Sequence, residues 1–352
     1  MFNPNYNITD KIVKALIEIA EAKAVIDRAK LLPKQELRLK RQALIRMSHS
    51  STAIEGNQLN LGQVEALYDQ KSIDAPSRDI WEVSNYLAAM RYIETVVKKK
   101  VLIDEKILLH IHKLVTDKTL PPDQSGTFRK CGVCVVRRRL GLPNEIIYSG
   151  PKFKDVPKLC QDFLSWLNDS KNLDINPVIV AGIAHQEIAA IHPFADGNGR
   201  TARALATLIL YSKGYDFKKL FALEDYYNQD LPSYYKAISF GNSYQERLVD
   251  FTPWLEYFTE GFREEIFSVK KKVQGLAGMK LNDLVESQIF LTPAQTQIID
   301  FIDQIGKITV KDVMDILNLP RRTAQLQLQK LKTLGIIKQV GKGPASGYVL
   351  EK

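Results

Sequence analysis

Cysteine is scarce in this chain, and its distribution excludes a disulfide-stabilised fold. Only Cys131, Cys134 and Cys160 occur among 352 residues, and a small, odd number is typical of a reducing compartment. Cys131 and Cys134 have zinc-knuckle spacing, but no second pair exists and they lie in an apolar run with strand character. We therefore predict small buried side chains here rather than metal ligands.

Long apolar runs are lacking as well. No stretch approaches the ~18 apolar residues that a membrane span requires. Asp10, Glu18 and Glu21 interrupt the apolar positions near the amino terminus, which argues against a signal peptide. We predict a cytoplasmic protein that does not bind a membrane.

Positive charge, by contrast, is in excess. The net charge is +9 and the pI is about 9.2, which favours an acidic partner: a nucleotide, a nucleic acid or an acidic protein surface. Charge alone does not choose among these three. Hydrophobic residues make up 45% of the chain and charged residues 25%, as in ordinary soluble proteins, and the length predicts two or three domains.

A polar loop between two apolar segments carries the strongest functional signal. Residues 177–190 and 204–211 indicate buried helices. Between them, Pro193 cannot continue the first helix, and Gly197 and Gly199 permit backbone angles and close approaches that other residues would block. The segment is therefore predicted to be a loop that leads into a helix N-terminus.

The side chains of this loop are suited to a polyphosphate. Asn198 can cap the second helix, which leaves backbone amides beside the positive end of its dipole, where phosphate binds. Arg200 and Arg203 are three residues apart, so both guanidinium groups can face the same anion. Asp196 offers an oxygen ligand for Mg²⁺, and His192 can take a proton at neutral pH. These groups are the parts needed for phosphoryl or nucleotidyl transfer.

The segment resembles the complete active-site motif of Fic-domain proteins, most of which transfer AMP from ATP to a protein hydroxyl. A P-loop is excluded, because no Gly-Lys-Ser/Thr follows the glycines. The motif positions that match are His192, Pro193, Phe194, Asp196, Gly197, Asn198, Gly199, Arg200 and Arg203.

The resemblance implies a role for each of these residues. His192 would be the catalytic base, and Asp196 would bind Mg²⁺. ATP would be the substrate, with its phosphates held by Gly197, Asn198, Gly199, Arg200 and Arg203. The partner would be a target protein that offers a Ser, Thr or Tyr hydroxyl. Because Asn198 and Arg200 match the AMP-transferring form, the phosphate-transferring and phosphocholine-transferring variants of the family are disfavoured.

Glu55 is placed against a local rule. It follows a predicted helix over residues 36–54, where a carboxylate meets the negative end of the helix dipole. Ser51-x-x-x-Glu55-Gly56 resembles the inhibitory motif of Fic proteins whose inhibitory helix precedes the catalytic domain. That resemblance implies that Glu55 pairs with Arg203 and occupies the space of the ATP γ-phosphate. Some relatives also use this Glu in AMP removal, and the sequence does not separate the two uses.

Two further segments surround the predicted core. Cys131 to Val136 and Glu145 to Tyr148 indicate the strands of a β-hairpin at about residues 128–150, which resembles the flap of Fic proteins that holds the target. Tyr235 and Asn242 have the spacing of the family's adenine pocket.

The last part of the chain has a different pattern. Predicted helices at residues 292–304, 309–317 and 321–334, followed by strands at 336–340 and 348–350 around a Gly-Lys-Gly-Pro turn, have the order of a winged helix-turn-helix. Arg321, Arg322, Gln325 and Gln329 occupy the recognition-helix positions. The same fold serves DNA binding, dimerisation and docking, so both DNA and a second copy of the chain stay open as partners.

Together these features predict a mainly α protein. Residues 1–100 form a helical region with the inhibitory motif, residues 101–275 a Fic-type catalytic core with its hairpin flap, and residues 285–352 a winged-helix domain. The favoured function is a protein adenylyltransferase inhibited by Glu55. The alternative is a DNA-binding transcriptional regulator that only senses ATP, against which an intact His192 argues, because sensing requires no base.

Overall fold

The structure is a computed structural model, and it describes residues 2–137, 145–172, 174–247, 249–278, 291–341 and 346–351. Over these residues the chain is mainly helical, as predicted, with fourteen α-helices and four short strands. It divides into two units. The first comprises residues 1–27, 43–68 and 72–270, and the second comprises residues 28–42, 69–71 and 271–352.

The first unit contains most of the helices. They are α1 (Asp10–Arg28), α2 (Pro33–Ala53), α3 (Leu61–Tyr68), α4 (Ser77–Lys99), α5 (Glu105–Val115), α6 (Val156–Leu167), α7 (Pro177–Ile191), α8 (Asn198–Ser212), α9 (Leu223–Gln229), α10 (Leu231–Ile238) and α11 (Thr252–Gly278). Short 3₁₀ turns occur at Ser170–Asn172 and Phe217–Lys219. The first part of α2 and the end of α11 belong to the second unit. The helices of residues 43–100 thus pack in the same unit as the predicted catalytic core.

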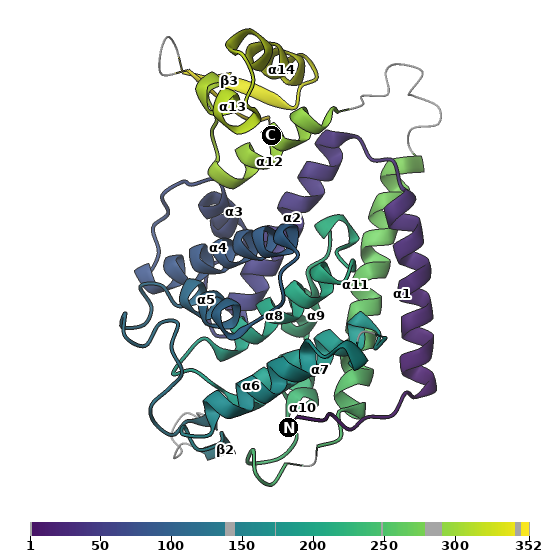
Figure 1. Cartoon of the computed structure of the whole chain (residues 1–352), viewed down its shortest axis with the longest axis vertical. Helices are drawn as coiled ribbons and strands as arrows, with labels where there is room; N and C mark the ends of the chain where they lie inside the picture. The colour runs from purple at the N-terminus through teal and green to yellow at the C-terminus, as the bar shows by residue number, and fades with distance from the viewer. Residues whose placement is uncertain are drawn as a thin grey trace. The chain divides into compact units, whose positions relative to one another are not determined.

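Helices α7 and α8 form the centre of this unit (Figure 1). Helix α7 is mostly apolar and almost entirely buried, as expected for a helix inside a core. It begins at Pro177, whose fixed φ suits a first helical turn, and the Asn176 side chain accepts the Val178 amide. Helices α4 and α5 pack on α8, and α6 packs on α7. The two central helices therefore hold the loop between them, residues 192–197, on a rigid support.

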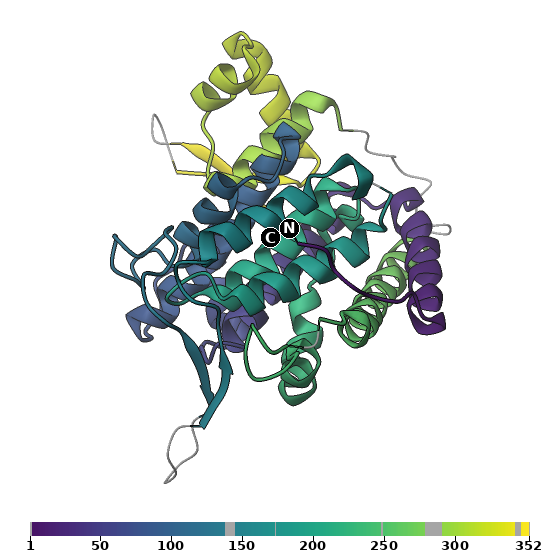
Figure 2. The same ribbon diagram turned by 60° about the horizontal axis from the view of Figure 1, so that its bottom comes forward.

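Helix α1 runs beside α11 (Figures 1 and 2). One face of α1 is buried, including Ile12, Ile19 and Ile26, because these residues recur at the seven-residue spacing of one helix face. Lys11 forms an ion pair with Glu256 on α11 at 3.1 Å. Apolar contact and surface ion pairs together attach α1 to the core.

The expected hairpin is present. Strands β1 (Cys134–Arg137) and β2 (Glu145–Ser149) pair antiparallel, with a bulge between Val135 and Val136. The turn over residues 138–144 lies outside the described residues. Ser149 also accepts the Tyr244 amide and donates to Asn242 O, so the segment that follows α10 covers the end of β2.

The prediction that Cys131 and Cys134 are buried is wrong. Cys160 on α6 is buried, but Cys131 and Cys134 are exposed. They lie at the start of the hairpin, which Figure 2 shows projecting from the helical core. Both thiols are exposed because the start of the hairpin lies outside the helical core.

The second unit has the predicted element order. Helices α12 (Pro293–Ile305), α13 (Val310–Leu317) and α14 (Arg321–Thr333) precede the antiparallel strands β3 (Ile337–Val340) and β4 (Gly347–Leu350). Most of the predicted turn between the strands, residues 342–345, lies outside the described residues, as do residues 279–290 before α12. Its buried core is formed by Ile298, Ile299, Ile302, Ile308, Val313, Ala324, Leu328, Leu331, Ile336 and Ile337.

Helix α14 presents its polar residues outward. Arg321, Arg322, Gln325 and Gln329 are all exposed, whereas Ala324, Leu328 and Leu331 of the same helix are buried. This division follows the helical period. None of the helices within the described residues has the length and apolar character needed to span a bilayer.

Candidate active site

The loop between α7 and α8 begins and ends in left-handed backbone. His192 closes α7 with φ 49° and donates its amide to Ile188 O, while Gly197 precedes α8 with φ 75°. The prediction that Asn198 caps α8 is wrong, because Asn198 is the first helical residue and the N-cap, Gly197, has no side chain. The backbone amides at the start of α8 are therefore left without a side-chain cap, as an anion site requires.

Asn198 braces the loop instead. Its side-chain amide donates to Phe194 O and accepts from Phe194 N, both at 2.9 Å. Phe194 is fully buried and stacks on the His112 ring with 3.7 Å between centroids. A contribution of Asn198 to phosphate binding would thus come from its backbone amide, because its side chain is engaged within the loop.

His112 on α5 supports the loop from below. The Gly126 amide donates to His112 Nδ1 at 2.9 Å, so Nε2 carries the proton and donates to Asp196 O at 3.0 Å. Burial lowers the pKa of His112 to about 4, which keeps the ring neutral at neutral pH. The sequence indicates only a packing or surface role for this residue, yet it fixes the backbone of the loop.

His192 is oriented as a base. Its Nδ1 lies 3.2 Å from Ala189 O, which can only accept, so Nδ1 carries the proton and the Nε2 lone pair is available. Burial lowers the pKa of the imidazole. The ring is therefore neutral at pH 7, the state in which it can remove a proton.

Arg203 and Glu55 form the ion pair that the sequence predicts. Arg203 Nη2 donates to Glu55 Oε1 at 2.7 Å and to Ser51 O at 2.8 Å, and Nε donates to Ser51 Oγ at 2.9 Å. Arg203 is buried, and this carboxylate helps to raise the pKa of its guanidinium further. Glu55 lies in the turn just after α2 rather than within the helix, and its side chain is 31% exposed.

Arg200 does not face Glu55. Its Nη1 is 3.6 Å from Glu82 Oε1 and 3.4 Å from Val115 O, and its Nη2 is 3.5 Å from Asp196 Oδ1. The expectation that both guanidinium groups face one anion is therefore not met in this structure, where the two arginines face different carboxylates. Arg200 is 1% exposed, and a buried cation requires such compensation.

Asp196 was predicted as the metal ligand, and it is paired with arginine here. Oδ2 accepts from Arg78 at 2.9 Å and Oδ1 accepts the Gly197 amide at 2.6 Å. Within the described residues no group of three His, Cys, Asp or Glu side chains could hold a metal ion. The Asp196 side chain is 37% exposed, so its carboxylate fits Mg²⁺, which usually takes one or two carboxylates together with substrate phosphates.

Gly199 leaves the space into which Glu55 reaches. A methyl group at residue 199 would overlap the Glu55 carboxylate and lie close to Arg203. The absence of a side chain here therefore permits an acid, or an anion of similar size, to reach the Arg203 guanidinium.

The two predicted adenine-pocket residues, Tyr235 and Asn242, contact different parts of the chain. Tyr235 donates its hydroxyl to Ile54 O at 3.1 Å, next to Glu55, and is 49% exposed. Asn242 is exposed, and its carbonyl accepts the Ser149 amide of the hairpin at 2.8 Å. Their contact with adenine stays a prediction.

Four residues contribute to the surroundings of the loop although no such role was predicted for them. Arg129, Glu82, Arg78 and His112 surround the loop, although none belongs to a motif that the sequence reasoning recognised. Glu82 is 5% exposed and Arg129 is also 5% exposed. Charged residues within predicted amphipathic or strand segments suggest that such residues have partners. The sequence does not identify these partners, because they are distant along the chain.

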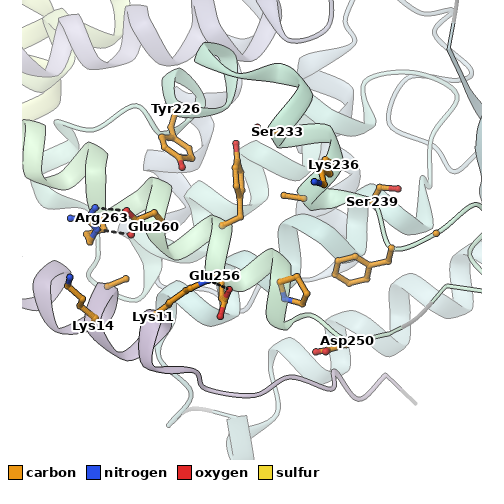
Figure 3. Close-up of a pocket in the computed structure, with 16 residues that line it drawn as sticks. Lys11, Lys14, Tyr226, Ser233, Lys236, Ser239, Asp250, Glu256, Glu260 and Arg263 are labelled. Atoms are coloured by element: carbon orange, nitrogen blue, oxygen red, sulfur yellow. Dashed lines mark hydrogen bonds and ion pairs between the residues drawn. The ribbon is translucent and has the colours of Figure 1, made fainter.

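A hollow of about 1110 Å³ lies elsewhere, between α1, α10 and α11 (Figure 3). Its charged groups include Lys11 paired with Glu256, and Arg263 paired with Glu260. No residue of the 192–203 loop lines it. The hollow is therefore separate from the predicted reaction site, and its Lys11–Glu256 pair connects α1 to α11.

Relatives were found by sequence. Residues 102–210 match the model of the Fic/DOC family. The chain is 36% identical over 181 residues to the protein adenylyltransferase Fic of Culex quinquefasciatus, covering 51% of this chain and 34% of that protein. It is 32% identical over 203 residues to the protein of the same name from Drosophila grimshawi, covering 57% and 38%. The chain thus spans little more than a third of the length of these relatives.

Solved structures give the same fold. A Fic family protein from Desulfovibrio desulfuricans G20 aligns with a TM-score of 0.64 and 27% identity over 99% of this chain and 98% of that one. Fic-1 from C. elegans aligns with a TM-score of 0.60 and 25% identity over 76% and 73%. Residues 102–210, which match the Fic/DOC family model, include His192 and the two arginines of α8, Arg200 and Arg203.

Proposed function

We propose that this Fic domain transfers AMP from ATP to a hydroxyl side chain of a target protein. The single observation that carries the proposal is the arrangement of His192 beside a glycine-lined helix N-terminus and the buried Arg203. This arrangement combines a neutral base with a site for a polyphosphate. The names of the relatives agree with it.

The proposed reaction uses the residues of the loop in defined roles. Backbone amides at the start of α8 and the Arg203 guanidinium would bind the phosphates of ATP. Asp196 would hold Mg²⁺, which supplies charge neutralisation on the phosphate oxygens. His192 Nε2 takes the proton of the target hydroxyl, whose oxygen attacks the α-phosphorus. The bond from the α-phosphorus to its bridging oxygen breaks, pyrophosphate leaves, and AMP stays on the target.

We propose that Glu55 inhibits this reaction by competition. Its carboxylate occupies the Arg203 guanidinium at 2.7 Å, so a γ-phosphate cannot use the same donors until Glu55 moves. Arg203 is buried, and it would be costly to leave it without an anion. One anion therefore has to replace the other.

AMP removal is a second candidate activity. Only Oε1 of Glu55 contacts Arg203, and the side chain is 31% exposed, so Oε2 can orient a water molecule. Incubation of an AMP-modified target with the protein and with Glu55→Gln tests this activity. Release of AMP by both proteins alike would contradict a role for Glu55.

For the second unit we propose DNA binding through α14. The supporting observation is the exposed set Arg321, Arg322, Gln325 and Gln329 on one helix, and basic residues outnumber acidic ones nine to three from Lys307 to the end. Binding of the whole protein to duplex DNA should weaken steeply with salt. Binding that is unaffected by a double Arg321→Ala, Arg322→Ala variant would favour a docking role instead.

Labelling with α-labelled ATP tests the main proposal. Glu55→Gly should transfer label to itself or to lysate proteins, and a second substitution, His192→Ala, should abolish the transfer. The modified lysate proteins can then be identified by mass spectrometry. If Glu55→Gly transfers no label but still binds ATP, the chain is an ATP-sensing regulator and the proposed activity is wrong.

A further inference from the structure

Arg129 is a buried cation that contacts no carboxylate among the described residues. It precedes the hairpin and is 5% exposed. Its guanidinium donates to three backbone carbonyls: Nε to His192 O at 2.8 Å, Nη1 to Cys131 O at 2.7 Å and Nη2 to Pro151 O at 2.6 Å. A charge placed in such surroundings has to be stabilised by well-aligned dipoles.

The three acceptors come from separate parts of the site. His192 supplies the proposed base, Cys131 leads into β1, and Pro151 follows β2. The Arg129 amide adds a fourth bond, to Pro193 O at 2.9 Å. One side chain thus connects the loop of the base to both ends of the hairpin.

Only arginine suits this place. The guanidinium group directs its donors in a fixed plane, so it can satisfy three carbonyls at once, whereas an ammonium group is a compact point charge on a flexible stem. The close approach also depends on Gly150, where an added methyl group would contact Arg129 Nη2 and Val133. Space for the guanidinium is therefore built into the base of the hairpin.

The conformation of His192 gives this contact its importance. With φ 49°, His192 is in the left-handed region that costs a non-glycine residue energy. The contact to its carbonyl stabilises that backbone, and the backbone sets the direction of the imidazole. Proton transfer requires the reacting atoms to be about 3 Å apart, and a misplacement of about 1 Å costs about 100-fold in rate.

We propose that Arg129 is a positioning residue that fixes the His192 backbone and the hairpin in one frame, so that a hydroxyl held by the hairpin meets Nε2 of the imidazole. This inference rests on the proposed AMP transfer. It adds a residue that touches neither nucleotide nor reacting atoms but determines where the base lies relative to the target.

The experiment compares variants in the Glu55→Gly protein. Arg129→Ala should lower the rate of label transfer about 100-fold, while the equilibrium dissociation constant for ATP stays unchanged, since Arg129 makes no contact with the proposed phosphate site. Low-millimolar guanidinium should restore transfer by entering the vacated space, and methylammonium should not. Lys130→Ala removes the exposed neighbouring cation and should have no effect.

Two controls separate this inference from the proposed function. The Glu55→Gly parent reports on AMP transfer itself, so a parent without activity contradicts the proposed function alone. An NMR titration of the His192 imidazole measures the influence of Arg129 on this histidine and does not require the protein to be catalytically active. Because the Arg129 charge helps to lower the pKa of His192, Arg129→Ala should raise that pKa.

Several results would overturn the proposal: parental transfer by Arg129→Ala, a loss that follows weaker ATP binding, or a loss that guanidinium does not restore. If Arg129→Ala does not fold, Arg129→Lys decides, because it keeps the charge and loses the planar fork. Reduced transfer by Arg129→Lys with unchanged ATP binding supports the proposal, and full transfer overturns it.

Discussion

Arg200 and Arg203 lie one helical turn apart on α8, and the side chains of both are 1% exposed, yet their surroundings differ. Arg200 faces Glu82 on α4 and Asp196 of the loop at 3.5–3.6 Å. Arg203 faces one carboxylate, Glu55, at 2.7 Å. The partners of Arg200 belong to the rigid support of the site, while Glu55 is on a turn that follows a helix.

This difference shows how one helix turn can combine a fixed charge with an exchangeable one. A buried cation is stable only with an anion beside it. Arg200 faces two carboxylates, Glu82 and Asp196, in this structure, whereas we propose that Arg203 exchanges its single carboxylate, Glu55, for a phosphate. The shorter contact is therefore the one proposed to break.

The largest effect is expected at the Glu55–Arg203 pair. Glu55→Gly should raise self-labelling about 100-fold, which corresponds to about 2.7 kcal/mol of competition removed. Gln58→Gly introduces the same residue at an exposed position nearby and serves as the control. Equal labelling by Glu55→Gly and the wild-type protein would mean that the Arg203 contact does not restrict ATP.

The fixed side should respond in stability rather than in activity. Glu82→Gln should lower the free energy of unfolding by about 2 kcal/mol, less than the roughly 3–5 kcal/mol of a fully broken buried pair, because Asp196 still faces Arg200. Denaturant unfolding measures this loss. Activation of labelling by Glu82→Gln would contradict the contrast between the two arginines.

Acid should also lower the free energy of unfolding, because it protonates His112 in the unfolded chain. The unfolded chain protonates this histidine near pH 6.5, but the folded chain does so only at about 4, so the unfolded state binds more protons between these values. The unfolding free energy is therefore highest above pH 6.5 and decreases as the pH is lowered. At pH 5.5 it is smaller by about 1.4 kcal/mol.

Denaturant unfolding over this pH range measures the effect. His112→Gln should flatten the slope, and His110→Gln, which removes an exposed histidine of the same helix, should leave it unchanged. A slope that persists in His112→Gln would assign the linkage to other groups.

The smallest effect is expected at Arg78. This residue is 60% exposed and pairs with Asp196 at 2.9 Å, so it would compete with Mg²⁺ for the carboxylate if Asp196 holds the ion as proposed. Arg78→Met should lower the Mg²⁺ concentration for half-maximal ATP binding about threefold, because exposed ion pairs contribute only about 0.2–1 kcal/mol. Arg91→Met on the same helix should change nothing. An unaltered requirement in Arg78→Met would show that Asp196 is accessible despite the pair.

The sequence alone predicts the local features of this site well. The helices on either side of the loop and the hairpin follow from periodicity, whereas the Glu55 to Arg203 contact is implied only by the family resemblance. These features depend on residues that are close in sequence or on a recognised pairing. The same holds for the order of helices and strands in the second unit.

Contacts between distant residues that lie outside the recognised motifs could not be predicted. Glu82 meets Arg200 only because α4 packs on α8, and Arg129 reaches His192 only because the hairpin returns to the core. Asn198 does not cap α8, because its side chain forms hydrogen bonds with the backbone of Phe194 instead. In each case the tertiary contact decides between local alternatives that the sequence leaves equal.

Gly199 has a consequence for how the inhibition can be changed. The room that its missing side chain leaves is shared by the Glu55 carboxylate and, as proposed, by the outer phosphate of the nucleotide. Any larger residue at position 199 would displace the Glu55 carboxylate and would also reduce the space for the phosphate. Release from inhibition therefore has to arise at the turn that carries Glu55, and mutations that activate the protein are expected to cluster there rather than in the helix that carries the arginines.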